Sequence, residues 1–174
     1  MGAAEARVQS GRVILVAGIP ASGKSSFGKH LVGSRNAIHV DVEEPASRAA
    51  AGFDPYWNRF VRLGDARGVT TFLGQRRTLG ILDWGFPPRC LGMVQALVHA
   101  GAEPWWFDGD RNAAYSLYRA HQFKNDEGSW RTQLAAIEAE WAAISQLFNG
   151  HIVQTVTDGP TVRDAEDIAM ALGV

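Results

Sequence analysis

A glycine-rich segment that ends in lysine and serine is the part of the chain best suited to chemistry. Residues 18–25 read Gly-Ile-Pro-Ala-Ser-Gly-Lys-Ser and match G-x-x-x-x-G-K-[ST] at every fixed position. Gly18 and Gly23 allow the backbone to curl so that successive N–H groups point at a phosphate, and the helix that follows adds its positive dipole end. Lys24 would reach the β- and γ-phosphates, and the Ser25 hydroxyl is a hard oxygen ligand for Mg²⁺. The residues predicted to bind a nucleoside triphosphate are Gly18, Ile19, Pro20, Ala21, Ser22, Gly23, Lys24, Ser25 and Ser26.

The segments around this loop predict an alternation of strands and helices. A continuous apolar run precedes the loop, which is typical of a parallel strand buried on both faces, and four further candidate strands follow it. The five expected strands are residues 13–17, 37–42, 79–83, 104–107 and 152–156. Strands that alternate with helices form right-handed crossovers, which place helices on both faces of a parallel sheet. Ligands of such sheets bind at the carboxyl ends of the strands.

Helical patterns fill the intervals between the expected strands. An apolar stripe predicts one long helix from about Ser129, and Thr161 with Asp164 resembles a capping box that opens the last helix. Residues 43–78 form the longest stretch without a clear strand, which favours a helical excursion over a second domain. The stripe consists of Leu134, Ile137, Trp141, Ile144 and Phe148.

Length, charge and cysteine content narrow the class of protein. With 174 residues, 46% of them hydrophobic, we expect a flexible terminus over residues 1–11 and a single domain with a buried core over residues 12–174. The net charge of −1 gives no basic field, so nucleic acid and membranes are not expected partners. Cys90 is the only cysteine, which excludes an intramolecular disulfide and suits a reducing cytoplasm. No apolar run approaches the roughly 20 residues of a membrane span. We therefore expect a cytoplasmic protein, whose oligomeric state the sequence leaves open.

The glycine-rich loop, read together with Ile-Leu-Asp-Trp-Gly-Phe at residues 81–86, resembles the P-loop kinase group. This group includes gluconate and shikimate kinases, chloramphenicol phosphotransferase, polynucleotide kinases and zeta toxins. The resemblance extends over most of the chain in the order of its elements. It implies an α/β, three-layer αβα P-loop fold with a five-stranded parallel sheet in the order 2-3-1-4-5. It also implies ATP as phosphoryl donor and Mg²⁺ as cofactor, without identifying the acceptor.

Carboxylates that end two expected strands are candidates for the catalytic base and a metal ligand. Asp41 ends the second strand, where the similar kinases place an aspartate that accepts or orients the proton of the acceptor hydroxyl. A helix cap or a solvated acid is the alternative for Asp41, and Glu43 is the second candidate for the base. Asp83 ends the third strand beside the loop, where a carboxylate can hold a Mg²⁺-bound water or bind the acceptor. The alternative for Asp83 is a cap of the next helix.

Basic residues after the fourth strand are candidates for charge neutralisation during transfer. The similar kinases place a mobile lid here, which we expect at about residues 111–131 and which also contains Lys124 and Arg131. Lid arginines neutralise charge as the phosphoryl group moves, and surface ion pairs are the alternative role. Among them we predict that Arg111 and Arg119 act in catalysis.

The leading functional hypothesis is an ATP-dependent phosphotransferase that acts on a hydroxyl of a small molecule such as a sugar, a nucleoside or an antibiotic. Residues 43–78 would cover the acceptor, because their aromatic rings and arginines could stack a ring and fix an anionic group, as could Trp84 and Arg89. A buried core is the alternative role for these rings. A polynucleotide 5′-hydroxyl kinase is a second hypothesis, which the near-neutral charge disfavours. A nucleotide-gated ATPase switch is the third, and the lack of an N/T-K-x-D motif favours ATP over GTP.

Overall fold

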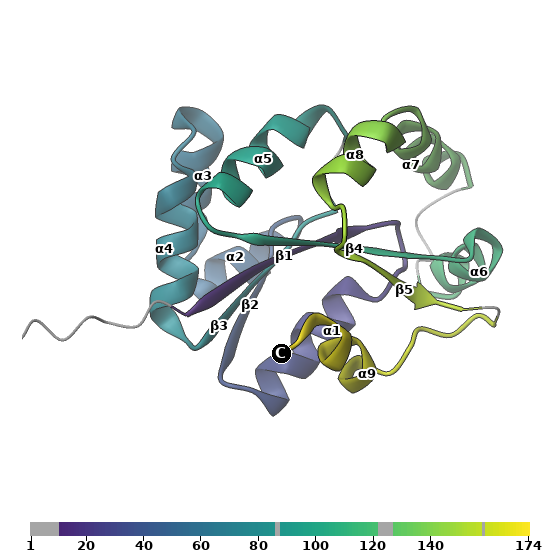
Figure 1. Cartoon of the computed structure of the whole chain (residues 1–174), viewed down its shortest axis with the longest axis horizontal. Coiled ribbons are helices and arrows are strands. Elements are labelled where there is room, and N and C mark those ends of the chain that lie inside the picture. Colours follow the sequence, from purple (N-terminus) through teal and green to yellow (C-terminus); the bar gives the residue numbers. More distant parts are fainter. Residues whose placement is uncertain (1–10, 86–87, 122–126, 158) are drawn as a thin grey trace, which may run out of the picture.

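The computed structural model describes residues 11–85, 88–121, 127–157 and 159–174. Most of the expected terminal segment, together with Phe86, Pro87 and Lys124, lies outside these ranges. Figure 1 shows the sheet at the centre of the fold, with helices above and below it. All four neighbouring strand pairs are parallel, and the strand order is β2-β3-β1-β4-β5, as predicted. The strands are β1 (Arg12–Gly18), β2 (Ala37–Asp41), β3 (Leu79–Asp83), β4 (Glu103–Gly109) and β5 (Ile152–Val156).

Helices cover both faces of this sheet and divide the core into two parts. On one face α1 (Lys24–Ser34) and α9 (Ala165–Leu172) pack against alternate residues of β1, including Ile14 and Val16. The other residues of β1, including Leu15, face a larger cluster that the remaining helices contribute. Strands with apolar side chains on both faces are the reason for the continuous apolar runs in the sequence. The helices of the larger cluster are α3 (Asp54–Leu63), α4 (Ala66–Arg76), α5 (Leu91–His99), α6 (Arg111–His121), α7 (Glu127–Ala139) and α8 (Trp141–Leu147).

The register of the strands brings two aspartates to the same edge of the sheet. In the β2–β3 pair Asp41 lies opposite Asp83, and in the β1–β3 pair Val16 lies opposite Asp83. Since β1 continues to Gly18, the glycine-rich loop begins just beyond this row. The parallel register therefore places both carboxylates beside the loop.

Two helical predictions differ from the structure at their boundaries. The predicted long helix is two helices, because α7 ends at Ala139 and α8 begins at Trp141 after a turn at Glu140. The turn lets α8 pack on the sheet, where Trp141 contacts the ring of Trp106 edge to face at 5.9 Å. The last helix begins later than predicted, because its N-cap is Asp164, whose Oδ1 accepts the Glu166 N–H at 2.8 Å.

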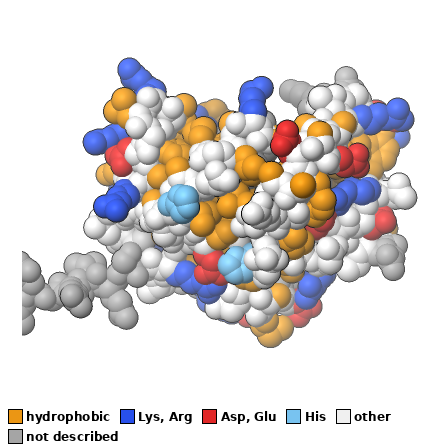
Figure 2. All heavy atoms as spheres, turned by 45° about the horizontal axis from the view of Figure 1, so that its top comes forward, with side chains coloured by type: hydrophobic (Ala, Val, Ile, Leu, Met, Phe, Trp, Pro, Cys, Tyr) orange, Lys and Arg blue, Asp and Glu red, His pale blue; other side chains and the backbone are white. Residues whose placement is uncertain are grey.

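The connection between β2 and β3 consists of helices in the structure. A short helix, α2 (Pro45–Ala51), precedes α3 and α4, and a 3₁₀ turn over Pro88–Cys90 follows β3. Figure 2 shows acidic and basic side chains interspersed on one face of the molecule, with hydrophobic side chains between them. No helix within the described ranges is both long enough and apolar enough to cross a membrane.

Candidate active site

The backbone conformation of the glycine-rich loop favours glycine at two positions. The φ angles of Gly18 and Gly23 are 148° and 85°, in the region that side chains disfavour. A Cβ on Gly18 would lie 2.2 Å from the carbonyl oxygen of Phe107, so the loop passes too close to β4 for any side chain there. The loop is also tied to β5, because the buried Thr155 Oγ1 donates to the Ser22 carbonyl at 2.8 Å.

The first turn of α1 opens at the end of this loop. Its N-cap is Gly23, and no side chain caps the helix end within the described chain. The N–H groups of a first turn have no partner inside their own helix, and the helix dipole places positive potential beside them. This end of α1 therefore suits an anion such as a nucleotide phosphate.

Lys24 places its ammonium group among the loop carbonyls and three carboxylates. Its Nζ donates to the Ile19 carbonyl at 3.0 Å and lies 3.4 Å from the Gly18 carbonyl. Burial lowers the pKa of Lys24 below its ordinary value, and the nearby carboxylates of Asp83, Glu43 and Asp41 oppose this change. A phosphate close to Lys24 would favour its charged form in the same way.

The hydroxyl of Ser25 lies between the two strand-end aspartates. Ser25 Oγ donates to Asp83 Oδ2 at 2.7 Å, and Asp41 Oδ2 lies 3.3 Å from the same oxygen. Asp83 is only 2% exposed, and His39 Nε2 lies 3.4 Å from its Oδ2. The Ser25 hydroxyl and the Asp83 carboxylate are hard oxygen donors of the kind that Mg²⁺ prefers, and Mg²⁺ keeps several waters besides its protein ligands. The donor set thus fits the predicted metal.

Glu43 lies at the rim of the site, opposite Lys24. Its Oε2 accepts the Gly85 N–H at 3.3 Å, which places the carboxylate beside the segment that follows β3. Although Glu43 is open to solvent on one side, partial loss of hydration raises its pKa above the ordinary value, while Lys24 opposes the rise. The Asp41 carboxylate in turn accepts the Glu43 N–H at 3.0 Å.

These groups line one cavity of about 1070 Å³. Of the residues predicted from sequence, most of the loop, Asp41, Glu43, Asp83 and Arg89 contribute to its wall. The sequence analysis did not identify Lys29, although it follows Ser25 by four residues and so shares its helix face. It also missed wall residues from α6 and α7, since no motif marks them. Those wall residues are Leu117, Tyr118, Thr132, Gln133, Ala136 and Ile137.

The predicted lid arginines lie away from this cavity wall. Arg111 pairs with Asp108 and donates to the Gly109 carbonyl at 2.9 Å. Arg119 is exposed, with its guanidinium carbon 6.0 Å from the centre of the Tyr115 ring. Arg131 pairs with Glu127 one helical turn away. Neither Arg111 nor Arg119 is brought together with Lys24 in this arrangement.

The aromatic residues of the β2–β3 connection do not line the cavity, and most of them are buried, although Tyr56 is exposed. Phe53 and Phe60 are buried, and the Trp57 ring meets Trp84 edge to face at 5.1 Å. Arg48 pairs with Asp54 at 2.8 Å, so this arginine is also engaged outside the cavity. Of the predicted acceptor-binding side chains, Arg89 is the one that lines the cavity in the described chain.

Comparison with known proteins identifies the fold. No protein-family model matches the chain, and no curated protein sequence matches it. A solved shikimate kinase from Bacteroides thetaiotaomicron is similar, with a TM-score of 0.58, 14% identity, and coverage of 94% of this chain and 99% of that one. A gluconokinase from Sinorhizobium meliloti 1021 has a TM-score of 0.53 at 15% identity, with coverage of 94% and 90%. A shikimate kinase from Acinetobacter baumannii in complex with shikimate has a TM-score of 0.54 at 15% identity, with coverage of 94% and 92%. The chain therefore has a P-loop kinase-like fold.

Proposed function

We propose that the protein is an ATP-dependent kinase that transfers the γ-phosphoryl group to a hydroxyl of a small molecule. The observation that carries this proposal is the Ser25 hydroxyl, which lies between Asp41 and Asp83 at the open N-terminus of α1. The uncapped N-terminus of α1, a lysine and a pair of carboxylates meet there in one cavity. The kinase-like fold and the small-molecule kinases with similar structures support the same reading.

The residues of the chain divide into those that hold the donor and those that act on the acceptor. The open amides of α1 and the Lys24 ammonium would bind the β- and γ-phosphates. Ser25 and Asp83 would hold Mg²⁺, which neutralises charge on the phosphate oxygens. Asp41 ends β2 on the other side of Ser25, where its carboxylate can face an acceptor hydroxyl. We assign it the role of base.

Transfer then requires one bond to form and one to break at the γ-phosphorus. The acceptor oxygen forms the new P–O bond, the bond to the bridging oxygen of ADP breaks, and Asp41 takes the hydroxyl proton. Arg89, exposed on the cavity wall beside the end of β3, is placed to balance charge on the acceptor or on the transferred group. Arg111 and Arg119 would take this role only if α6 moved toward the phosphates.

The decisive experiment follows the fate of the γ-phosphate. Purified protein is incubated with Mg²⁺·ATP and a pool of hydroxylated metabolites, and phosphorus NMR records the products. A new phosphoester resonance that is lost in the Lys24→Ala variant supports the proposal. Inorganic phosphate alone, formed at the same rate with and without the pool, contradicts it and favours a nucleotide-gated ATPase.

A further inference from the structure

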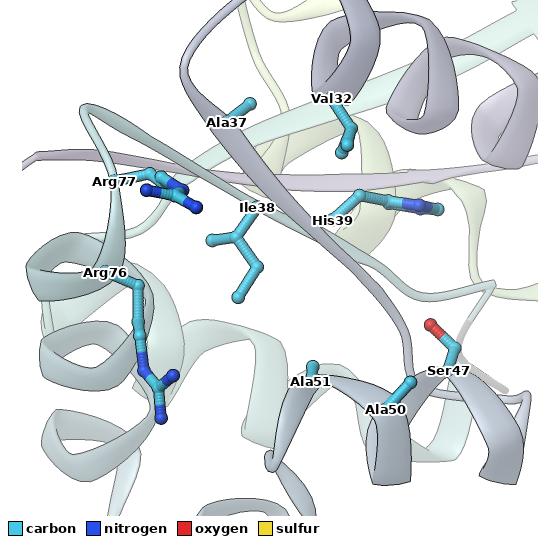
Figure 3. A pocket seen from close by; sticks show the side chains of 9 residues that line it. All are labelled: Val32, Ala37, Ile38, His39, Ser47, Ala50, Ala51, Arg76 and Arg77. Carbon is cyan, nitrogen blue, oxygen red and sulfur yellow. The ribbon is translucent and has the colours of Figure 1, made fainter.

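A second cavity, of about 580 Å³, follows the free edge of the sheet along β2. We call it the β2-edge groove. In Figure 3 the side chains of Val32 and His39 lie on the α1 side of the β2 ribbon, whereas Ile38 points toward α2 and α4. None of its lining residues lines the active-site cavity. The groove is lined by Val32, Ala37, Ile38, His39, Ser47, Ala50, Ala51, Arg76 and Arg77.

The backbone N–H groups of β2 that face the free edge have hydrogen-bond partners at both ends of the strand. The one in the middle has none among the described residues. The Ala37 N–H donates to the Arg35 carbonyl at 2.9 Å, and the Asp41 N–H donates to Ser47 Oγ at 3.0 Å. The Val42 N–H points the other way, to Asp83 in β3. Because successive peptide groups of a strand point to opposite sides, the N–H and C=O of His39 face the free edge. No described residue hydrogen-bonds to these two groups.

The side chains around this open edge combine positive charge with apolar surface. Arg76 and Arg77 are both exposed; the Arg76 guanidinium carbon lies 4.6 Å above the Phe72 ring, and neither arginine has an acidic partner among the described residues. Among the residues that the structure describes, no carboxylate lines the groove. Val32, 49% exposed, provides apolar surface on the opposite side of the strand.

We propose that the β2-edge groove binds an extended acidic segment of another protein, which adds to β2 as a sixth strand. The backbone of such a segment would pair with the open groups of His39, since strand addition supplies hydrogen-bond partners to the unpaired edge of a sheet. Its alternate side chains would point to opposite sides of the sheet. Acidic side chains would meet Arg76 and Arg77, and apolar ones would cover Val32. A compact small anion could meet the arginines, but it would not span both sides of the strand.

The binding test uses a fluorescein-labelled hexapeptide in which valine and aspartate alternate. Fluorescence anisotropy should show saturable one-site binding, weakened about 2- to 30-fold in the double variant Arg76→Gln/Arg77→Gln, as expected for the loss of two exposed ion pairs. The matched control is Arg62→Gln/Arg67→Gln, which removes two exposed arginines outside the groove. Circular dichroism melts check that all variants fold. Absence of binding, or equal loss in both double variants, would overturn the proposal.

A second measurement tests the backbone pairing itself. Two versions of the hexapeptide carry N-methyl groups on alternate residues, so that each blocks one edge of the extended peptide. Strand addition predicts that only one version binds. The contrary result is that both N-methylated versions bind equally and that benzoate competes with them for Arg76 and Arg77. That result would show a small-anion site and refute strand addition. A dimer in light scattering that does not bind the peptide, and that the Arg76→Gln/Arg77→Gln substitutions weaken, would assign the edge to a second copy of the chain and also refute strand addition.

Discussion

Replacing Asp83 by asparagine is expected to weaken metal binding while leaving the fold intact. Asparagine keeps the shape of this nearly buried side chain, and its oxygen can still accept the Ser25 hydroxyl that lies 2.7 Å from Asp83 Oδ2. What is lost is the negative charge of Asp83, which is proposed to hold Mg²⁺ through a bound water. Removal of a group that orients a metal ligand costs about 10- to 100-fold in metal affinity. That range corresponds to about 1.4–2.7 kcal/mol.

The assay is a Mg²⁺ titration of the protein with a fluorescent ATP analogue. The Mg²⁺ concentration at half-maximal nucleotide binding should rise 10- to 100-fold in Asp83→Asn. Asp167→Asn serves as control, because it removes one exposed acidic charge on α9, away from the cavity. Thermal unfolding should be similar for the two variants. If the Mg²⁺ dependence of Asp83→Asn equals that of the wild type, Asp83 does not act at the metal.

Three further outcomes follow from the contacts described above. Asp41→Asn should retain nucleotide binding but lower the transfer rate about 10²- to 10⁴-fold in single-turnover assays, and full turnover would exclude Asp41 as the base. Gly18→Ala should lose nucleotide binding in the same fluorescence assay, because the new methyl group would meet the Phe107 carbonyl; unchanged affinity would mean that the loop tolerates the shift. The Arg12 guanidinium, which hydrogen-bonds Glu103, lowers the pKa of that carboxyl below its ordinary value. The pair therefore contributes stability above about pH 4.5 and loses it on acidification. At pH 7 Glu103→Gln should lower Tm by about 2–4 °C if the half-exposed pair contributes about 1 kcal/mol. The difference from wild type should shrink toward pH 3, and a difference that is constant with pH would contradict this reasoning.

The sequence predicted the parts of the fold that depend on local patterns. Apolar runs located β1 and β3, which are buried almost throughout, and the apolar residues of β2, β4 and β5 located those strands although polar residues interrupt them. The spacing of the glycines and lysine located the glycine-rich loop, whose backbone shape favours those residue types. The positions of Asp41 and Asp83 at strand ends followed from the same strand boundaries, and the parallel register then brought them together at Ser25.

Other features depend on tertiary packing that local patterns do not encode. The orientation of α6 directs Arg111 to Asp108, and the sequence offers only their three-residue spacing as a signal. The turn at Glu140 arises because α8 must place Trp141 on the sheet, and the heptad-like apolar stripe continues through it without interruption. The wall that α6 and α7 add to the cavity likewise results from packing between distant segments.

The bond between Thr155 and Ser22 also affects the order in which the site can form during synthesis. These residues are 133 positions apart, and the loop is held on its other side by the Ile19 N–H, which donates to the Phe107 carbonyl at 3.1 Å. When only β1, α1 and β2 have been synthesised, the nascent chain already contains the whole glycine-rich motif. The two strands that hold the loop in its final shape, β4 and β5, have not yet been made. A nascent chain that ends before β5 thus contains the complete glycine-rich motif but lacks the Thr155 hydroxyl that holds the Ser22 carbonyl.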